Sequence, residues 1–299
     1  MIFASKPSLR LFNQTASRNQ PESKEQSQSY WDDWAPSYKK HQDNDGNDDF
    51  HRKLIDFVIR RTSLTKEHRV LDLGCGPGRH SRLLARTAKE VTAFDLSPAM
   101  IELARNSPDG SGLNINYQVL DWDEADPAAL GWEKAFDLTL ASRTPALHNL
   151  QSLEKMIQTI NQGFGVIISA VETANSLRDD LYGPLKIDQE TARGSRSAYL
   201  EFNFLWLLGY FPEVTYFDQK WLAPRSLESA IAGQKRYFNI ISPLSPEEEE
   251  LLVQTLTQKA RDNIVMEEVE AKTILIIWET PPQNRAEKCI TNRDSPSGS

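Results

Sequence analysis

The stretch that decides the fold is Val70–Gly78, which reads Val-Leu-Asp-Leu-Gly-Cys-Gly-Pro-Gly. The apolar run predicts a buried strand, and the glycines predict a tight loop that opens onto a helix. A second apolar run ends at Asp95, seventeen residues after Gly78. In a doubly wound α/β fold, such glycines let the backbone approach a ligand, and the acid accepts from ribose hydroxyls. The two features together predict a nucleoside site.

The spacing of the glycines indicates which nucleoside fits. A dinucleotide fingerprint, G-x-G-x-x-G, would put its third glycine at position 79, where the chain has Arg79. The carboxyl group of Asp72, two residues before the first glycine, would repel a pyrophosphate and attract a cationic amino acid tail. An NAD-type site and an ordinary strand–turn–helix with incidental glycines remain as alternatives.

Three motifs, Val70–Gly78, Asp95 and the pair Asp121-Trp122, resemble those of the class I S-adenosylmethionine (SAM)-dependent methyltransferases. The resemblance covers residues 30–170 well and the remainder loosely. It implies SAM as the cofactor and methyl transfer by in-line displacement. The segment Ala141–His148 is most similar to one in uncharacterised bacterial methyltransferases, and this similarity does not indicate a substrate.

The resemblance also implies which residues bind SAM. The glycine loop would approach the methionine half, with Asp72 facing the ammonium group and Cys75 as a small filler. Asp95 would accept from the ribose, and Asp121 and Trp122 would contact the adenine. The expected cofactor-binding residues are Asp72, Gly74, Cys75, Gly76, Gly78, Asp95, Leu96, Met100, Asp121, Trp122 and Ser142.

Candidate catalytic residues are few. The segment Ala141–His148 stands where the family has its substrate-facing motif, but it carries neither an Asp/Asn-Pro-Pro-Tyr/Phe element nor a Pro-Cys pair. His148 is a candidate general base, with a plain helix-start role as the alternative. The aromatic segment Tyr30–Tyr38 is expected to cover the cofactor as a lid, with Tyr38 as a candidate near the sulfonium; ordinary packing is the alternative.

Composition limits the partners. The net charge of -8 argues against a general electrostatic grip on nucleic acid. Two cysteines, Cys75 and Cys289, cannot form a disulfide framework or hold a radical-SAM cluster, and they fit a reducing compartment. No metal-ligand spacing and no membrane-length apolar run is present. We therefore expect a cytoplasmic protein; the segment Met1–Gln20 faintly resembles a transit peptide, which would make it organellar.

Strand and helix patterns alternate from Arg69 to Ala170 and predict a mainly parallel, seven-stranded, doubly wound sheet. In the family the last two strands form an antiparallel pair. Here a helical insertion, about 223–266, separates Trp221 from Thr273. It is expected either to wall the substrate pocket or to pack on the sheet edge. The expected organisation is a disordered arm (1–29), one methyltransferase domain (30–280) and a disordered tail (281–299).

The expected function is methyl transfer to a small-molecule acceptor, with no nucleic acid or membrane partner. A protein or RNA methyltransferase is one alternative, and a non-catalytic SAM- or nucleoside-binding module is another. The oligomeric state and the acceptor atom are left open by the sequence.

Overall fold

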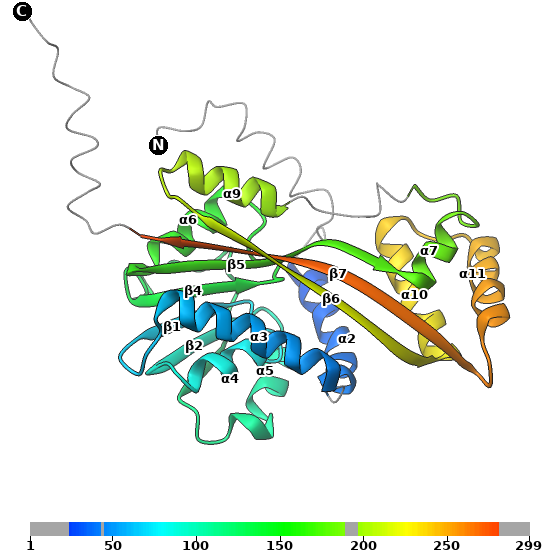
Figure 1. Cartoon of the computed structure of the whole chain (residues 1–299), viewed down its shortest axis with the longest axis horizontal. Coiled ribbons are helices and arrows are strands. Elements are labelled where there is room, and N and C mark those ends of the chain that lie inside the picture. Colours follow the sequence, from blue (N-terminus) through cyan, green and yellow to red (C-terminus); the bar gives the residue numbers. More distant parts are fainter. Residues whose placement is uncertain (1–23, 43–44, 189–196, 281–299) are drawn as a thin grey trace, which may run out of the picture.

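A seven-stranded sheet runs through the computed structural model, which describes residues 24–42, 45–188 and 197–280. The strand order is β3-β2-β1-β4-β5-β7-β6, with β1 to β5 parallel and β7 antiparallel to both of its neighbours (Figure 1). The expected doubly wound, mainly parallel sheet is confirmed. Its strands are β1 (Arg69–Leu73), β2 (Glu90–Asp95), β3 (Ile115–Val119), β4 (Phe136–Ser142), β5 (Ile160–Asn175), β6 (Glu213–Ser226) and β7 (Ile264–Glu279).

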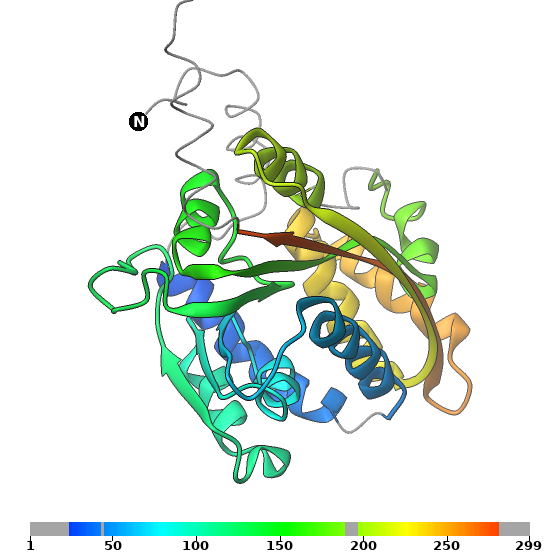
Figure 2. The ribbon, with the colours of Figure 1, turned by 60° about the vertical axis from the view of Figure 1, so that its left-hand side comes forward.

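Helices cover both faces of this sheet (Figure 2). Those before β4 are α2 (Lys24–Gln42), α3 (Asp45–Thr62), α4 (Arg79–Ala85), α5 (Pro98–Arg105) and the short 3₁₀ turn η2 (Pro108–Gly110). Those after β4 are α6 (Leu150–Gln158), α7 (Ser176–Tyr182), α9 (Ser197–Leu207), α10 (Leu227–Ile241) and α11 (Pro246–Lys259).

Strand alternation divides the core into two layers. Successive side chains point to opposite faces of a sheet, so Val70 packs with α3 and α4 while Leu71 packs with α6 and α9. The central strands are apolar on both faces, as expected for parallel strands that are covered on both sides. This arrangement leaves the carboxyl ends of β1 to β4 as the place where polar side chains gather.

A third apolar cluster lies away from these two layers. The far ends of β5, β6 and β7 extend beyond the main sheet and carry α7, α10 and α11 (Figure 1). Leu181 of α7, Phe238 of α10 and Leu252 of α11 are fully buried there. This unit, residues 176–188 and 227–263 with the strand ends beneath them, is called the distal lobe below.

The predicted boundaries of the insertion are wrong. The β6–β7 pair is not interrupted at Trp221, which pairs with Val269; pairing continues to Ser226 opposite Ile264. The helices of the insertion therefore occupy only 227–259. Glu267 obscured the strand pattern, because this acid is buried at an inward position and is neutralised by Arg225, with Asn175 donating to it; the N···O distance is 2.8 Å in each case.

The predicted bounds of the arm are also wrong. Residues 24–29, which were expected to belong to it, form the first part of α2. The helix α2 is polar and lacks a strong apolar stripe, so its tertiary contacts with α5 decide its structure. The rest of the arm and the tail 281–299 lie outside the described residues.

We predict that Gly165→Ala destabilises the protein. Gly165 of β5 pairs with Trp278 of β7, and a Cβ at 165 would lie 2.0 Å from the buried indole ring. Overpacking of this kind costs about 1–3 kcal/mol, so the free energy of unfolding in urea should fall. The matched control is Gly233→Ala in α10, where a Cβ meets no described atom within 4 Å. It should leave stability unchanged or raise it by up to about 1 kcal/mol. Equal effects of the two changes would contradict the packing argument.

We also predict that Glu201→Gln stabilises the protein more at pH 8 than at pH 5. Glu201 lies on the inner side of α9, its Oε2 has no hydrogen-bond partner among the described residues, and burial raises its pKa to about 8. Between pH 5 and 8 the folded protein keeps a proton that the unfolded chain has lost, so wild-type stability falls as the pH rises. Thermal melts of both proteins across this range test it. The difference in Tm should grow with pH; a constant difference would contradict the buried, unpaired carboxylate.

Candidate functional site

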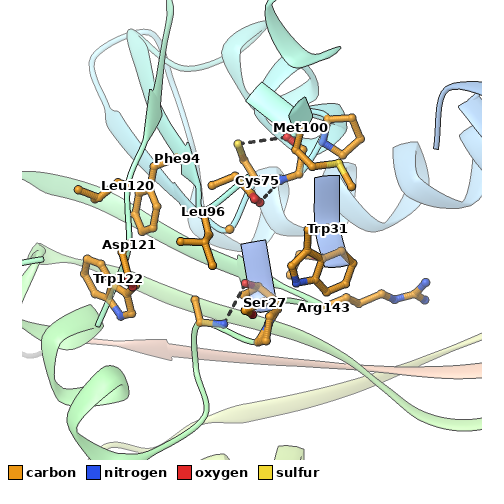
Figure 3. A pocket seen from close by; sticks show the side chains of 18 of the residues that line it. Ser27, Trp31, Cys75, Phe94, Leu96, Met100, Leu120, Asp121, Trp122 and Arg143 are labelled. Atoms are coloured by element: carbon orange, nitrogen blue, oxygen red, sulfur yellow. Dashed lines mark hydrogen bonds between the residues drawn. The ribbon is translucent and has the colours of Figure 1, made fainter. Parts of the chain in front are cut away.

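A cavity of about 610 Å³ lies at the carboxyl ends of β1, β2, β3 and β4. β1 is the strand at which the order of a doubly wound sheet reverses, and ligands of such folds bind there. Figure 3 shows Leu120, Asp121 and Trp122 at one side of the cavity, Leu96 near its centre, and Trp31 and Arg143 on the other side.

The glycine loop forms the floor of the cavity. Gly74 and Gly76 both line it and have positive φ values of 60° and 53°. Gly74 is also required by packing, because a Cβ there would lie 2.0 Å from Oγ1 of Thr144. The amide of Cys75 donates to the carbonyl of Phe94 (2.8 Å) and ties the loop to β2. Cys75 lines the cavity, and burial raises the pKa of its thiol, which keeps the sulfur uncharged.

Asp95 holds the loop from the opposite side. Its Oδ2 accepts from the amide of Gly76 (2.8 Å), and its Oδ1 accepts from the amide of Ser97 (2.9 Å). Burial raises the pKa of Asp95 above its usual range, and the two amide donors oppose that shift. A carboxylate has about four lone-pair sites, so it can keep both backbone partners and still accept from a ligand in the cavity.

Two residues of the expected cofactor set are not among those lining the cavity. Asp72 is buried beneath the loop and accepts from Oγ of Ser81 (2.5 Å). Burial raises its pKa to about 7. Gly78 precedes α4 and is covered by the side chain of Tyr117. Both residues lie beneath the loop, and their predicted contacts with the cofactor, for Asp72 directly or through water, stay predictions.

The other expected cofactor residues, Leu96, Met100, Asp121, Trp122 and Ser142, all line the cavity. The ring of Trp122 stacks on Phe94 with centroids 5.3 Å apart, and its Nε1 donates to the carbonyl of Ser152 (3.1 Å). This packing fixes the indole as a flat, apolar wall. Asp121 stands beside it and forms an ion pair with Lys24 at 3.3 Å.

Helix α2 closes one side of the cavity. Trp31 and Ser27 line it, and Asp32 accepts from Oγ of Ser97 (2.5 Å) at the start of α5. Lys24 at the first turn of α2 reaches Glu124 (2.6 Å) as well as Asp121. Trp31 is therefore a wall residue, as expected for the aromatic segment. The side chain of Tyr38 lies outside the described residues, so its predicted role stays a prediction.

His148 also lines the cavity, next to the start of α6. Its Nδ1 lies 3.3 Å from the carbonyl oxygen of Pro145, and its Nε2 lies 2.7 Å from Nδ2 of Asn149. Asp123 is 3.6 Å from the same Nε2. Both ring nitrogens thus have protein partners, which favours a structural role over that of a general base.

Sequence reasoning missed a basic group in the wall, formed by His51, Arg79, His80 and Arg143. Nδ1 of His51 and Nε2 of His80 are 2.8 Å apart. Burial, with help from the two arginines, lowers the pKa of His80 to about 3 and also lowers that of His51. Both imidazoles are therefore neutral at physiological pH. No sequence signal links them, since they lie 29 positions apart on different helices.

The remaining side-chain chemistry is limited. No group of three or more His, Cys, Asp or Glu within residues 24–42, 45–188 and 197–280 is arranged to hold a metal ion. Over the same residues, no helix has the length and apolar content needed to cross a bilayer.

Comparison with known proteins agrees with this geometry. A family model described as a methyltransferase domain matches residues 70–163. The ubiquinone biosynthesis O-methyltransferase of Xylella fastidiosa (strain M23) is 43% identical over 65 residues, which are 22% of this chain and 26% of that protein. The enzyme of the same name from Coxiella burnetii (strain Dugway 5J108-111) is 39% identical over 67 residues, 22% of this chain and 28% of that protein. The matched segment thus spans only about a quarter of each curated relative.

Solved structures share the fold over a larger part of the chain. The [4+2]-cyclase SpnF has a TM-score of 0.53 at 17% identity, covering 89% of this chain and 99% of its own. A candidate type II methyltransferase from Anaeromyxobacter dehalogenans has a TM-score of 0.51 at 16% identity, covering 78% and 97%. Residues 70–163 thus match a methyltransferase domain, and the described part of the chain shares its fold with these solved structures.

Proposed function

We propose that this protein transfers a methyl group from SAM to a small-molecule acceptor. The observation that carries the proposal is the cavity itself. It brings the glycine loop, the carboxylate of Asp95 and the Asp121-Trp122 pair together at the carboxyl edge of the sheet. The chemistry of these groups fits the three parts of SAM: an amino acid, a ribose and an adenine.

Each part of SAM then has a surface. The backbone of Gly74–Gly76 receives the amino acid half. The positive φ values of Gly74 and Gly76 favour glycine, so no side chain at these two positions occupies the space. Asp95 accepts from the ribose hydroxyls. Asp121 accepts from the adenine amino group, and Trp122 covers one face of the ring. Leu96, Met100 and Leu120 supply the apolar surface around the ring.

When bound, SAM would supply a methyl group that its sulfonium sulfur, as the leaving group, activates for in-line attack. The protein's main tasks are therefore alignment and exclusion of water. Helix α2 serves the second task. Trp31 closes the cavity beside Arg143, and the Asp32–Ser97 hydrogen bond holds α2 against α5. Trp31 also offers an aromatic face, which attracts cations by about 0.5–2 kcal/mol.

Two observations favour a small acceptor. Helix α2 walls the cavity opposite the sheet edge, and the protein has a net charge of -8, which does not suit nucleic acid. The curated relatives are named ubiquinone biosynthesis O-methyltransferases, which supports a small-molecule acceptor for this chain as well. A protein or RNA acceptor would need an open cleft, and a non-catalytic module would not need the full set of contacts.

The cavity also bears on the expected role of the insertion. None of the described residues that line the cavity comes from the distal lobe or from β5, β6 and β7. We therefore assign the acceptor walls to α2, α3 and the segment after β4, in place of the insertion. The distal lobe has its own apolar core, which fits the alternative that it packs at the end of the sheet.

We predict that the protein binds S-adenosylhomocysteine and converts SAM to it when a pool of small metabolites is supplied. Titration calorimetry and detection of S-adenosylhomocysteine by mass spectrometry check the two parts. Preference for NAD would contradict the assignment of the site. Binding without turnover on any metabolite, protein or RNA pool would favour a binding module.

We predict that Asp95→Asn weakens S-adenosylhomocysteine about tenfold to hundredfold. The asparagine still offers one oxygen to the backbone, but the charged acceptor for the ribose is lost, at about 1.5–3 kcal/mol. The matched control is Asp126→Asn, which changes an exposed acid that accepts from the amide of Ala128 (3.0 Å) outside the cavity. It should leave the affinity unchanged. Unchanged affinity in a folded Asp95→Asn variant would remove Asp95 from the site.

A further inference from the structure

Charge is separated across the cavity. The lining acids Asp95, Asp121, Asp123 and Glu124 follow β2 and β3, where Lys24 partly neutralises them. The lining arginines, Arg79 and Arg143, follow β1 and β4. Since β2 and β3 lie on one side of β1 and β4 lies on the other, the nucleoside end is acidic and the opposite end is basic.

The two histidines at the basic end add a hydrogen-bond donor. The hydrogen bond between Nδ1 of His51 and Nε2 of His80 uses one nitrogen of each ring. Because both imidazoles are neutral, each carries one proton, and one of the two outer nitrogens is always an N–H donor. The pair therefore offers a donor whichever ring donates the internal bond.

Arg143 is held firmly in this position. Its backbone has a φ of 48°, and its amide donates to the carbonyl of Ile168 in β5 (2.8 Å). Its Nη2 donates to Oγ1 of Thr273 in β7 (2.7 Å). A guanidinium carries five N–H donors in a planar fork, the geometry that matches a carboxylate. Strands β5 and β7 thus hold Arg143, which lines the cavity.

We propose that His51, His80, Arg79 and Arg143 form a subsite for the carboxylate group of the methyl acceptor. The proposal rests on the proposed function and names the acceptor class, a small carboxylic acid. A carboxylate matches the forked donors of arginine and carries the opposite charge. Arg143 belongs to the segment after β4 and His51 to α3, so neither comes from the glycine loop or from the strands assigned to the nucleoside.

The test uses benzoate as the probe and benzamide as its neutral match, titrated calorimetrically into the full chain saturated with S-adenosylhomocysteine. Benzoate is expected to bind at least about tenfold more tightly than benzamide, because only benzoate is charged. Arg143→Gln and Arg79→Gln should each reduce that preference, and His51→Phe should weaken benzoate as well. The control His68→Gln, at a histidine that contacts Thr65 outside the cavity, should change nothing.

Equal binding of benzoate and benzamide would overturn the subsite, as would a preference kept in both arginine variants. Binding of inorganic phosphate in place of benzoate would overturn the carboxylate class. A second comparison tests whether these residues instead bind the carboxylate of the cofactor. If the group held that one, Arg143→Gln would weaken S-adenosylhomocysteine but not 5′-methylthioadenosine, which lacks the amino acid, and the acceptor assignment would fail. If S-adenosylhomocysteine itself does not bind, the proposed function fails, and the benzoate titration on the chain alone still decides the subsite.

Discussion

The carboxylate of Asp95 is the interaction on which the site depends. One oxygen accepts from Gly76 in the loop, and the other accepts from Ser97 at the start of α5. Ser97 in turn donates to Asp32 of α2. A single side chain thus connects the floor of the cavity, the helix after β2 and the helix that closes one side. These hydrogen bonds hold α2, the helix that closes one side of the cavity, in its position.

The position of Asp95 at this edge of the sheet explains why its carboxylate is buried and still lines the cavity. Burial raises its pKa, and backbone amides favour the charged form. Asp72 of β1, the neighbouring strand, is held by the hydroxyl and the backbone of Ser81, and burial raises its pKa to about 7. Both acids were expected to contact the cofactor, Asp72 at the ammonium group and Asp95 at the ribose. In the structure Asp95 lines the cavity and Asp72 is buried beneath the glycine loop.

The distal lobe shows how a long antiparallel pair can carry a separate core. β6 and β7 remain paired from Glu213 to Ser226, and the helices at their far end bury their own apolar side chains. Because the lobe contributes no described residue to the cavity lining, the site is built from the helices and loops around β1 to β4. The lobe and the site are therefore two separate features of one sheet.

Local patterns in the sequence determined the central strands and the motifs. The run Val70–Gly78, the acid at 95 and the pair at 121–122 depend on neighbours within a few residues, and β2 ends at Asp95 as predicted. Tertiary structure decided what depends on distant partners. α2 is held by contacts with α5, the far ends of β6 and β7 pair Arg225 with the buried Glu267, and His51 meets His80 only because α3 and α4 pack on the same face. No periodic pattern in the sequence marks such pairings, because the two partners lie far apart in the chain and stabilise each other only once the fold brings them together.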